Sequence, residues 1–526
     1  MSSSSFKRRI LKVIAAFIII AIPLGGFTWY QFFRDVPQPE WITGDPEMNF
    51  LYGSIGSESE AGMPYWIVTV LPRIFGNEYL PGPGGYASLG LPWEEGKEFP
   101  AGFSKKTIGF ERVAFNCALC HATTYRIEEN QTPIIVAGGG SHTADIQGLL
   151  EFFSKSAKDA RFNADTILTE IDMAYQLSWI DRMLYKFLFI PLTKKQLIEQ
   201  GEDFGWADSR PRWGPGRDAP MNLTKFNFLR MKDDDSVDNT DFPSIWHLEV
   251  RVQEGRTWPE DDYSTEADFS TINIDPSRLM LMNLAGDTTS FRSVLIDSAL
   301  GLQAQNTPFF HRRMEDLEKW LRELPPPVYP KEIGIDEQLA TAGEEVFEQH
   351  CATCHATERD NRMGTVIPIG EIRTDAHRTE AWTREAANEA NEKVVEFGIE
   401  RTPMSKPDQP GYTALQLDGL WLRGPYLHNG SVPTVAALLE PEERRPKVFY
   451  RGYDVLDREN LGFVFRRCVD PYVPTLESPV QSPCMPADKG WKFDTTEKGN
   501  GNGGHEFGTD LSDGDKRALV EYLKKL

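Results

Sequence analysis

The sequence predicts a mainly α-helical chain in which two domains with extensive loops follow an N-terminal transmembrane helix. Three observations support this prediction. The chain has 526 residues, which is more than a single hydrophobic core usually organises, so two domains are expected. It begins with a basic segment followed by a long apolar run, and each half ends in apolar residues with the period of an amphipathic helix.

The N-terminal segment has the pattern of a membrane anchor. Basic residues 7–9 precede an apolar run over residues 10–27, and Trp29 and Tyr30 follow it. Basic flanks stay cytoplasmic and aromatic residues favour the membrane interface. We therefore expect residues 1–35 to form an anchor that crosses the inner membrane once through residues 10–33, with the rest of the chain in the periplasm. A cleaved signal peptide is the alternative, but the run is long for one.

The two domains are predicted on either side of a proline-rich linker. Residues 36–325 form the first domain, and its opening part, residues 36–110, is rich in Pro and Gly and is expected to be mostly loops. Residues 325–330 contain four prolines and cannot continue a helix. Residues 326–526 form the second domain.

Each half ends in a predicted amphipathic helix. The spacing i, i+3, i+4, i+7 is met by two sets of residues: Leu317, Trp320, Leu321 and Leu324, and Leu519, Tyr522, Leu523 and Leu526. The second helix has Ser512 and Asp515 at the positions of a capping box. A further helix precedes residue 351, and we expect its Gly343 and Phe347 to cross the C-terminal helix, because glycine allows two helix backbones to approach.

One Cys-x-x-Cys-His motif lies in each half of the chain. In this motif two thiols bind the vinyl groups of one porphyrin, and the adjacent histidine binds its iron. A zinc site would need two further ligands, and a thioredoxin-type pair does not need the histidine. The sequence therefore predicts two covalently bound haem c groups in two cytochrome c-like domains, held by Cys117, Cys120 and His121 and by Cys351, Cys354 and His355.

Two cysteines, Cys468 and Cys484, remain outside the motifs. An even pair in an oxidising compartment favours a disulfide, and two free thiols are the alternative. The formal net charge of −22 disfavours nucleic acid as a partner. It favours a basic redox partner protein.

The sixth iron ligands decide between electron transfer and reaction at the metal, because an open position admits O₂ or peroxide. For the second haem the candidates are His505, which lies in a loop with glycines on both sides, then Met404, then His428. Near the first haem, His142 and His247 have the simpler interpretation of polar or packing residues.

Several segments together resemble a known family. Residues 422–434 read Leu-Arg-Gly-Pro-Tyr-Leu-His-Asn-Gly-Ser-Val-Pro-Thr, and residues 503–511 read Gly-Gly-His-Glu-Phe-Gly-Thr-Asp-Leu. With residues 109–116, 214–218 and 241–246, they resemble the rubber-oxygenase-like di-haem cytochromes, which belong with the bacterial di-haem cytochrome c peroxidases and the enzyme MauG. The resemblance covers most of residues 80–526.

The resemblance implies a mostly helical fold whose two haems exchange electrons across the domain interface. It implies that His505 is the distal ligand of the second haem and that His428 is an interface residue. It also implies that the first haem lacks a strong sixth ligand and is the reactive centre. By analogy, Trp246 lies between the haems and has a catalytic role. Where relatives have Trp-Asp-Gly, residues 257–262 read Thr-Trp-Pro-Glu-Asp-Asp.

Two main functional hypotheses follow. The first is a periplasmic peroxidase or oxygenase, with the His121 haem reacting and the His355 haem relaying electrons from a cytochrome or a quinol-linked donor or acceptor. The second is a pure electron-transfer cytochrome with both irons six-coordinate. A structural protein that retains haem is a third class.

Overall fold

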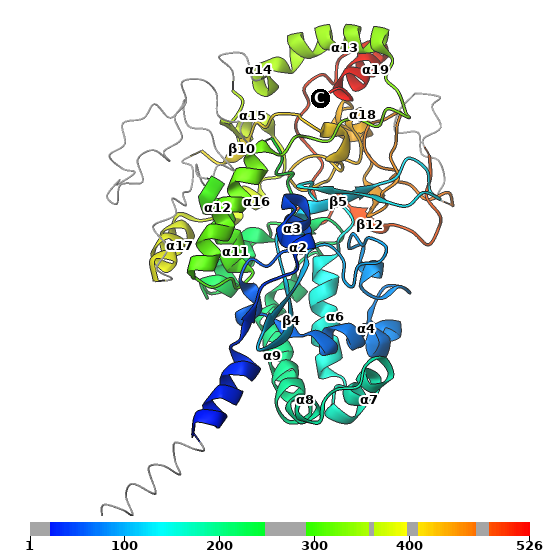
Figure 1. Cartoon of the computed structure of the whole chain (residues 1–526). Helices are drawn as coiled ribbons and strands as arrows, with labels where there is room; N and C mark the ends of the chain where they lie inside the picture. The colour runs from blue at the N-terminus through cyan, green and yellow to red at the C-terminus, as the bar shows by residue number, and fades with distance from the viewer. Residues whose placement is uncertain (1–20, 248–290, 357–361, 397–408, 470–482) are drawn as a thin grey trace, which may run out of the picture.

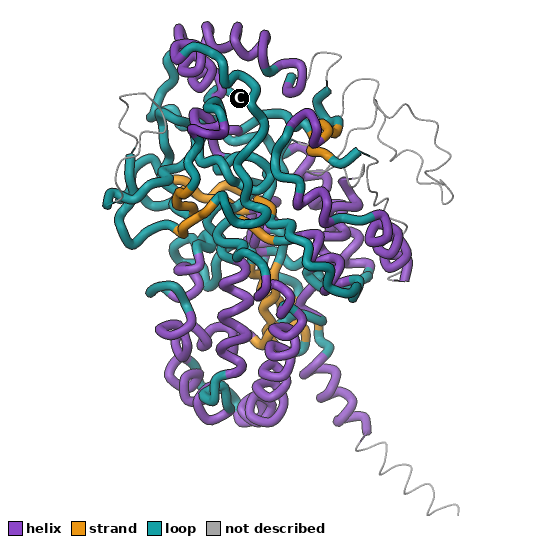
Figure 2. Tube along the Cα trace, turned by 180° about the vertical axis from the view of Figure 1, so that it is seen from behind, coloured by secondary structure: helices purple, strands orange, loops and turns teal. Residues whose placement is uncertain are grey.

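The computed structural model describes residues 21–247, 291–356, 362–396, 409–469 and 483–526. It is 46% helical and contains several small sheets, so the prediction of a mainly α-helical fold is wrong. The 43 glycines and 36 prolines explain much of the difference, because both residues interrupt helices. Figure 2 shows how much of the chain is loop, above all at the end opposite the N-terminal helix.

The helices and strands are short and alternate with loops along both halves. The helices are α2 Glu40–Thr43, α3 Pro46–Tyr52, α4 Tyr65–Tyr79, α5 Ala118–His121, α6 Ile146–Lys158, α7 Ala164–Ala174, α8 Trp179–Leu184, α9 Ile190–Asp203, α10 Pro220–Asn222, α11 Phe291–Gly301, α12 Pro308–Glu323, α13 Glu337–His350, α14 Ala352–His355, α15 Ile369–Ile372, α16 His377–Ala381, α17 Arg384–Glu396, α18 Val435–Leu438 and α19 Asp513–Leu523. The strands are β1 Asp35–Val36, β2 Met63–Pro64, β3 Phe103–Ile108, β4 Phe110–Phe115, β5 Ala122–Tyr125, β6 Ile134–Ala137, β7 Arg217–Asp218, β8 Thr240–Asp241, β9 Val366–Pro368, β10 Gly411–Thr413, β11 Val448–Arg451 and β12 Trp491–Asp494.

An antiparallel sheet with strand order β1-β3-β4-β2 organises the first half. Helices α4, α6, α7, α8 and α9 gather at one end of the molecule (Figure 1), where their apolar faces share one core with Phe103 and Val113 of the sheet. β3 and β4 form a hairpin in the register Phe103↔Phe115. The hairpin matters for the site because β4 ends two residues before Cys117.

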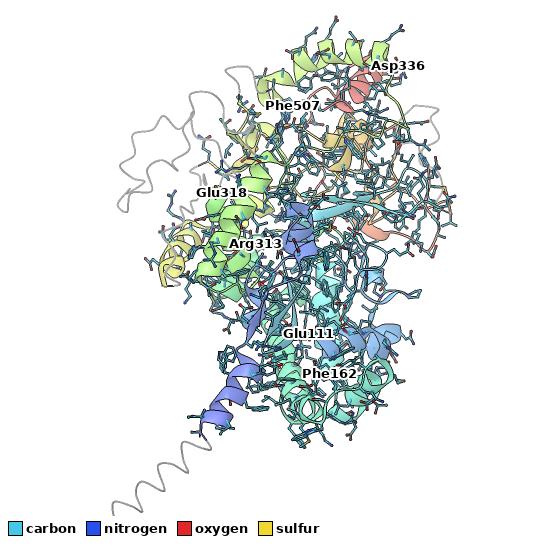
Figure 3. The ribbon with its side chains drawn as sticks, in the orientation of Figure 1. Glu111, Phe162, Arg313, Glu318, Asp336 and Phe507 are labelled. Atoms are coloured by element: carbon cyan, nitrogen blue, oxygen red, sulfur yellow. A yellow bond between two sulfur atoms is a disulfide. The ribbon has the colours of Figure 1, made fainter. Side chains whose placement is uncertain are left out.

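Helices α13 and α19 cross at the opposite end of the molecule (Figure 1). A Cβ at Gly343 would overlap the Ala518 carbonyl of α19, and Phe347 packs against Tyr522 at 5.3 Å between ring centres. Ser512 caps α19 by accepting a hydrogen bond from the Asp515 backbone. The predicted helix crossing and its cap are confirmed. Side chains at both ends of α13, including Asp336, can be followed in Figure 3.

The predicted transmembrane helix and the single-pass inner-membrane location are not supported. Within the described ranges, no helix is long and apolar enough to cross a membrane. Of the N-terminal helix, the structure describes residues 21–32. Its end also packs on the folded domain: Gln31 Nε2 donates to Asp181 Oδ1 at 3.0 Å, and Phe32 contacts Phe189. Residues 10–20 of the predicted span lie outside the described residues.

Cys468 and Cys484 form a disulfide, with Cα atoms 5.0 Å apart. The prediction made from the leftover cysteine pair is therefore confirmed. The bond joins two segments whose backbones also pair, since Cys468 N donates to the Met485 carbonyl at 3.0 Å.

Candidate haem sites

The first motif lies on the short helix α5, directly after the β3–β4 hairpin. Asn116 positions it: Oδ1 accepts from Ala118 N at 2.9 Å, and Nδ2 donates to the Gly53 carbonyl at 2.9 Å. Cys117 and Cys120 are free thiols, and Cys117 is buried. Both thiols are therefore available for thioether formation.

His121 is held as a neutral metal ligand would be. Its Nδ1 lies 2.9 Å from the Pro243 carbonyl, so this nitrogen carries the proton and donates it, and Nε2 keeps a free lone pair. Burial lowers the pKa of His121 to about 4. The neutral form, which metals bind, therefore prevails at neutral pH.

The second motif repeats this arrangement. Helix α13 leads directly into Cys351, and α14 ends at His355. His355 Nδ1 lies 2.6 Å from the Leu415 carbonyl, and burial lowers the pKa of the imidazole. Cys351 and Cys354 are free thiols. In both motifs a backbone carbonyl from a distant loop orients the histidine.

His505 faces His355. Their ring centres are 6.3 Å apart with planes inclined by 45°. Two imidazoles that bind one iron from opposite sides, each with its nitrogen about 2 Å from the metal, have centres roughly 6 Å apart. His505 Nδ1 is buried without a hydrogen-bond partner, and burial, with the nearby His355, lowers the pKa of His505 to about 4. The residues present therefore fit a haem held between two histidines.

The other candidate ligands of the second site lie elsewhere. Met404 lies outside the described residues. His428 is buried, and its ring stacks on Tyr412 with centres 3.9 Å apart. Its carbonyl accepts a hydrogen bond from Asp241 N of the first half at 2.9 Å. This contact between the two halves agrees with an interface residue.

No imidazole of the described ranges makes a ring contact with His121 as His505 does with His355. His142 is buried, stacks on Phe463 and has Nδ1 2.9 Å from Thr123 Oγ1. His247 Nδ1 lies 2.7 Å from Asp418 Oδ2. Residues 257–262 lie outside the described part of the chain.

Trp246 contacts the segments next to both motif histidines. A Cβ on Gly139 would lie 3.0 Å from its ring, and one on Gly419 would lie 2.7 Å from it. Its Nε1 donates to the Asp418 carbonyl at 2.9 Å. Gly138, the residue before Gly139, donates its amide to the His121 carbonyl. Asp418 lies three residues after Leu415, whose carbonyl orients His355. A role for Trp246 between the haems remains a prediction.

Sequence reasoning missed three kinds of residue in these sites. The carbonyls of Pro243 and Leu415 leave no signal, because any residue offers a carbonyl. Asp218 is half-buried, and desolvation together with the Asp238 charge raises its pKa to about 8. The Asp218 carboxylate is also one of the charges that raise the pKa of the Cys120 thiol, so this acid lies near the first motif. The third is Arg445, whose guanidinium donates to carbonyls of the loop that contains His505.

Comparisons with known proteins agree with this chemistry. Residues 411–450 match the family described as RoxA-like, cytochrome c-like. This segment contains Leu415, and a cytochrome c-like domain implies covalently bound haem c. The match supports a cytochrome c of the rubber-oxygenase-like kind and, with it, a haem redox function.

The chain is also similar to two Sinorhizobium fredii (strain NBRC 101917 / NGR234) proteins, y4iJ and y4iM, both described as uncharacterized. It is 29% identical to y4iJ over 267 residues, which cover 39% of this chain and 41% of y4iJ. It is 30% identical to y4iM over 247 residues, which cover 39% of this chain and 52% of y4iM. The chain thus matches about half or less of each relative.

Proposed function

We propose that the chain is a periplasmic di-haem c-type cytochrome with peroxidase-like or oxygenase-like activity. The site at His121 is the reactive centre, and the site at His355 relays electrons. One observation carries the proposal: the two sites differ, because an imidazole faces His355 at 6.3 Å between ring centres, whereas the described residues place none in ring contact with His121. A closed site suits electron transfer and an open one suits reaction.

When bound, haem c would supply an iron that exchanges electrons and that could bind O₂ or peroxide where the chain provides no second ligand. The residues of the chain do the rest. Pro243 and Leu415 hold the two motif histidines in one tautomer. Asp218, whose pKa desolvation and the Asp238 charge raise to about 8, is an acid near Cys120, and the cleavage of peroxide needs an acid. Trp246 bridges the backbone segments beside the two sites.

The disulfide and the charge of the chain support the compartment and the partner. A disulfide such as Cys468–Cys484 persists in oxidising compartments, where c-type haem is also used. The net charge of −22 favours docking of a basic redox protein, a cytochrome or a quinol-linked donor or acceptor. Association should therefore weaken as salt is added.

The test is spectroscopic and uses the full-length holoprotein. Mass and pyridine haemochrome spectra should give two haems per chain. Carbon monoxide added to the reduced protein should change one of them. His505→Ala should make a second haem high-spin and reactive to carbon monoxide, because the closing imidazole is lost, and the control His428→Gln should not.

Several outcomes would contradict the proposal. One haem per chain would exclude the relay. If carbon monoxide and peroxide leave the wild-type spectrum unchanged, the pure electron-transfer hypothesis replaces the enzymatic one. If Met404→Ala opens the second site and His505→Ala does not, the assignment of His505 is wrong.

A further inference from the structure

Arg445 lies buried beneath the loop that presents His505. Its side chain is 1% exposed, and its guanidinium offers five N–H donors in a rigid plane. Every donor has a carbonyl partner. Nε donates to Glu440 at 2.9 Å. Nη1 donates to Asn502 at 2.7 Å and to Gly504 at 2.7 Å. Nη2 donates to Leu438 at 3.1 Å and to His505 itself at 3.4 Å.

These five carbonyls belong to two separate segments. Residues 438–440 form the C-terminal end of helix α18 and the two residues after it, and residues 502–505 form the loop that ends at the candidate ligand. The planar guanidinium group of Arg445 therefore holds the two segments in one fixed geometry. A lysine ammonium carries the same charge but only three donors on one atom, so it cannot reach both sets of carbonyls.

The anchored segment is itself tied to the helices that position His355. The buried carboxylate of Glu440 accepts from Lys516 Nζ of α19 at 2.8 Å. Helix α19 packs across α13, and α13 leads directly into the second motif. Both imidazoles are therefore positioned against one α13–α19 frame, His355 through the chain and His505 through Arg445.

The His505 loop needs this support because its backbone is strained. His505 has φ +48° and Gly504 has φ +73°, and the αL region is costly for a residue other than glycine. A Cβ on Gly504 would overlap the backbone of Arg373. Outside the guanidinium contacts, one backbone hydrogen bond, from His505 N to the Ile372 carbonyl at 2.7 Å, holds the residue.

We propose that Arg445 is a positioning residue that holds His505 in ligating geometry and thereby keeps the second site closed. The inference rests on the proposed role of His505 as the distal ligand. Arg445 does not touch the iron position, and it acts through the carbonyls of the loop. Its positive charge, which acts on the His505 ring, also favours the reduced iron and so raises the potential of this site.

The experiment compares Arg445→Lys with Arg444→Lys in the full-length holoprotein. Arg444 is the adjacent residue, its side chain is 54% exposed, and among the described residues its guanidinium pairs with the Glu440 carboxylate at 3.5 Å. Ferric spin state, carbon monoxide binding and redox potential are measured for both. Arg445→Lys should raise the high-spin fraction of one haem severalfold and admit carbon monoxide there, while Arg444→Lys should match wild type. The unchanged spectrum of the first site reports that the variant is folded.

His505→Ala, measured in parallel, separates the two possible failures. If His505→Ala opens the second site and Arg445→Lys leaves it fully low-spin with an unchanged potential, Arg445 is not the positioning residue. If His505→Ala itself leaves the site closed, the proposed ligand is wrong. Should Arg445→Lys not accumulate as holoprotein, Arg445→Gln, which keeps fewer donors and no charge, is read in the same way.

Discussion

At the scale of single residues, buried histidines without charge partners determine how the fold responds to acid. His142 is 3% exposed, and its Nε2 has no hydrogen-bond partner. Burial is the main reason that its pKa falls from 6.5 to about 3. Below about pH 6.5, His142 therefore binds a proton in the unfolded chain but stays neutral in the folded chain.

The sign of the pH dependence follows. The contribution of neutral His142 to the free energy of unfolding is fully present above the unfolded pKa of about 6.5. It is lost as the pH falls from about 6.5 towards about 3. At about 1.36 kcal/mol per pH unit, the loss amounts to as much as about 5 kcal/mol. His142→Gln can keep the contact with Thr123 and does not titrate, so urea unfolding between pH 7 and about 4 should show a shallower loss. His311→Gln, on the exposed face of α12, is the control. Equal slopes for both variants would refute the assignment.

At the scale of elements, the crossing of α13 and α19 positions the second motif. These two helices make the most extensive contact between elements of the described chain, and Gly343 is the point of closest approach. A methyl group there must push the backbones apart. Displacement of α13 would also move Cys351, its C-cap residue.

Gly343→Ala should therefore reduce the free energy of unfolding by about 1–3 kcal/mol, the usual cost of overpacking. Chemical denaturation of the holoprotein measures the change. Gly370→Ala in α15 is the matched control, because a Cβ there meets nothing within 4 Å, and it should be neutral or slightly stabilising. A stable Gly343→Ala protein with unaltered haem spectra would show that the crossing tolerates separation.

At the scale of the whole molecule, polar contacts join residues more than 200 positions apart. Arg451 of β11 is fully buried and pairs with Asp241 of β8, with Nη1 2.9 Å from Oδ1 and Nη2 3.0 Å from Oδ2. Arg126 and Asp454 form a second link, with Nε 2.7 Å from Oδ1. β5 ends directly before Arg126, and β12 pairs with β11, which carries Arg451; both strands are labelled in Figure 1. The two halves are therefore expected to unfold together.

Arg451→Met should cost about 3–5 kcal/mol, because it leaves the Asp241 carboxylate buried without its partner. Arg458→Met is the control: the Arg458–Glu128 pair also joins the two halves, but its side chains are 43% and 56% exposed, so its loss should cost less than about 1 kcal/mol. Thermal unfolding followed separately at the haem bands and by far-ultraviolet circular dichroism measures both. Equal effects would show that burial does not decide the strength of these links.

The sequence alone determined the local chemistry of this protein. Some features depend on residues close together in the chain and can be read from the sequence directly. They are the two motifs, the leftover cysteine pair, the Ser512 cap and the apolar periods of the last helices. The glycine-flanked His505 was found in the same way. The predicted membrane span is not supported within the described residues, and local hydropathy gave no sign that Gln31 and Phe32 contact α8 and the segment after it.

Only the tertiary structure decided which distant groups meet. The carbonyls that orient His121 and His355 come from 122 and 60 positions away along the chain, and Arg445 reaches a loop 57 to 60 positions further on. Backbone carbonyls have no side-chain signature, and loops rich in glycine and proline follow no period. The loop content of the fold and the approach of His505 to His355 therefore follow from long-range packing and hydrogen bonding, which no local pattern encodes.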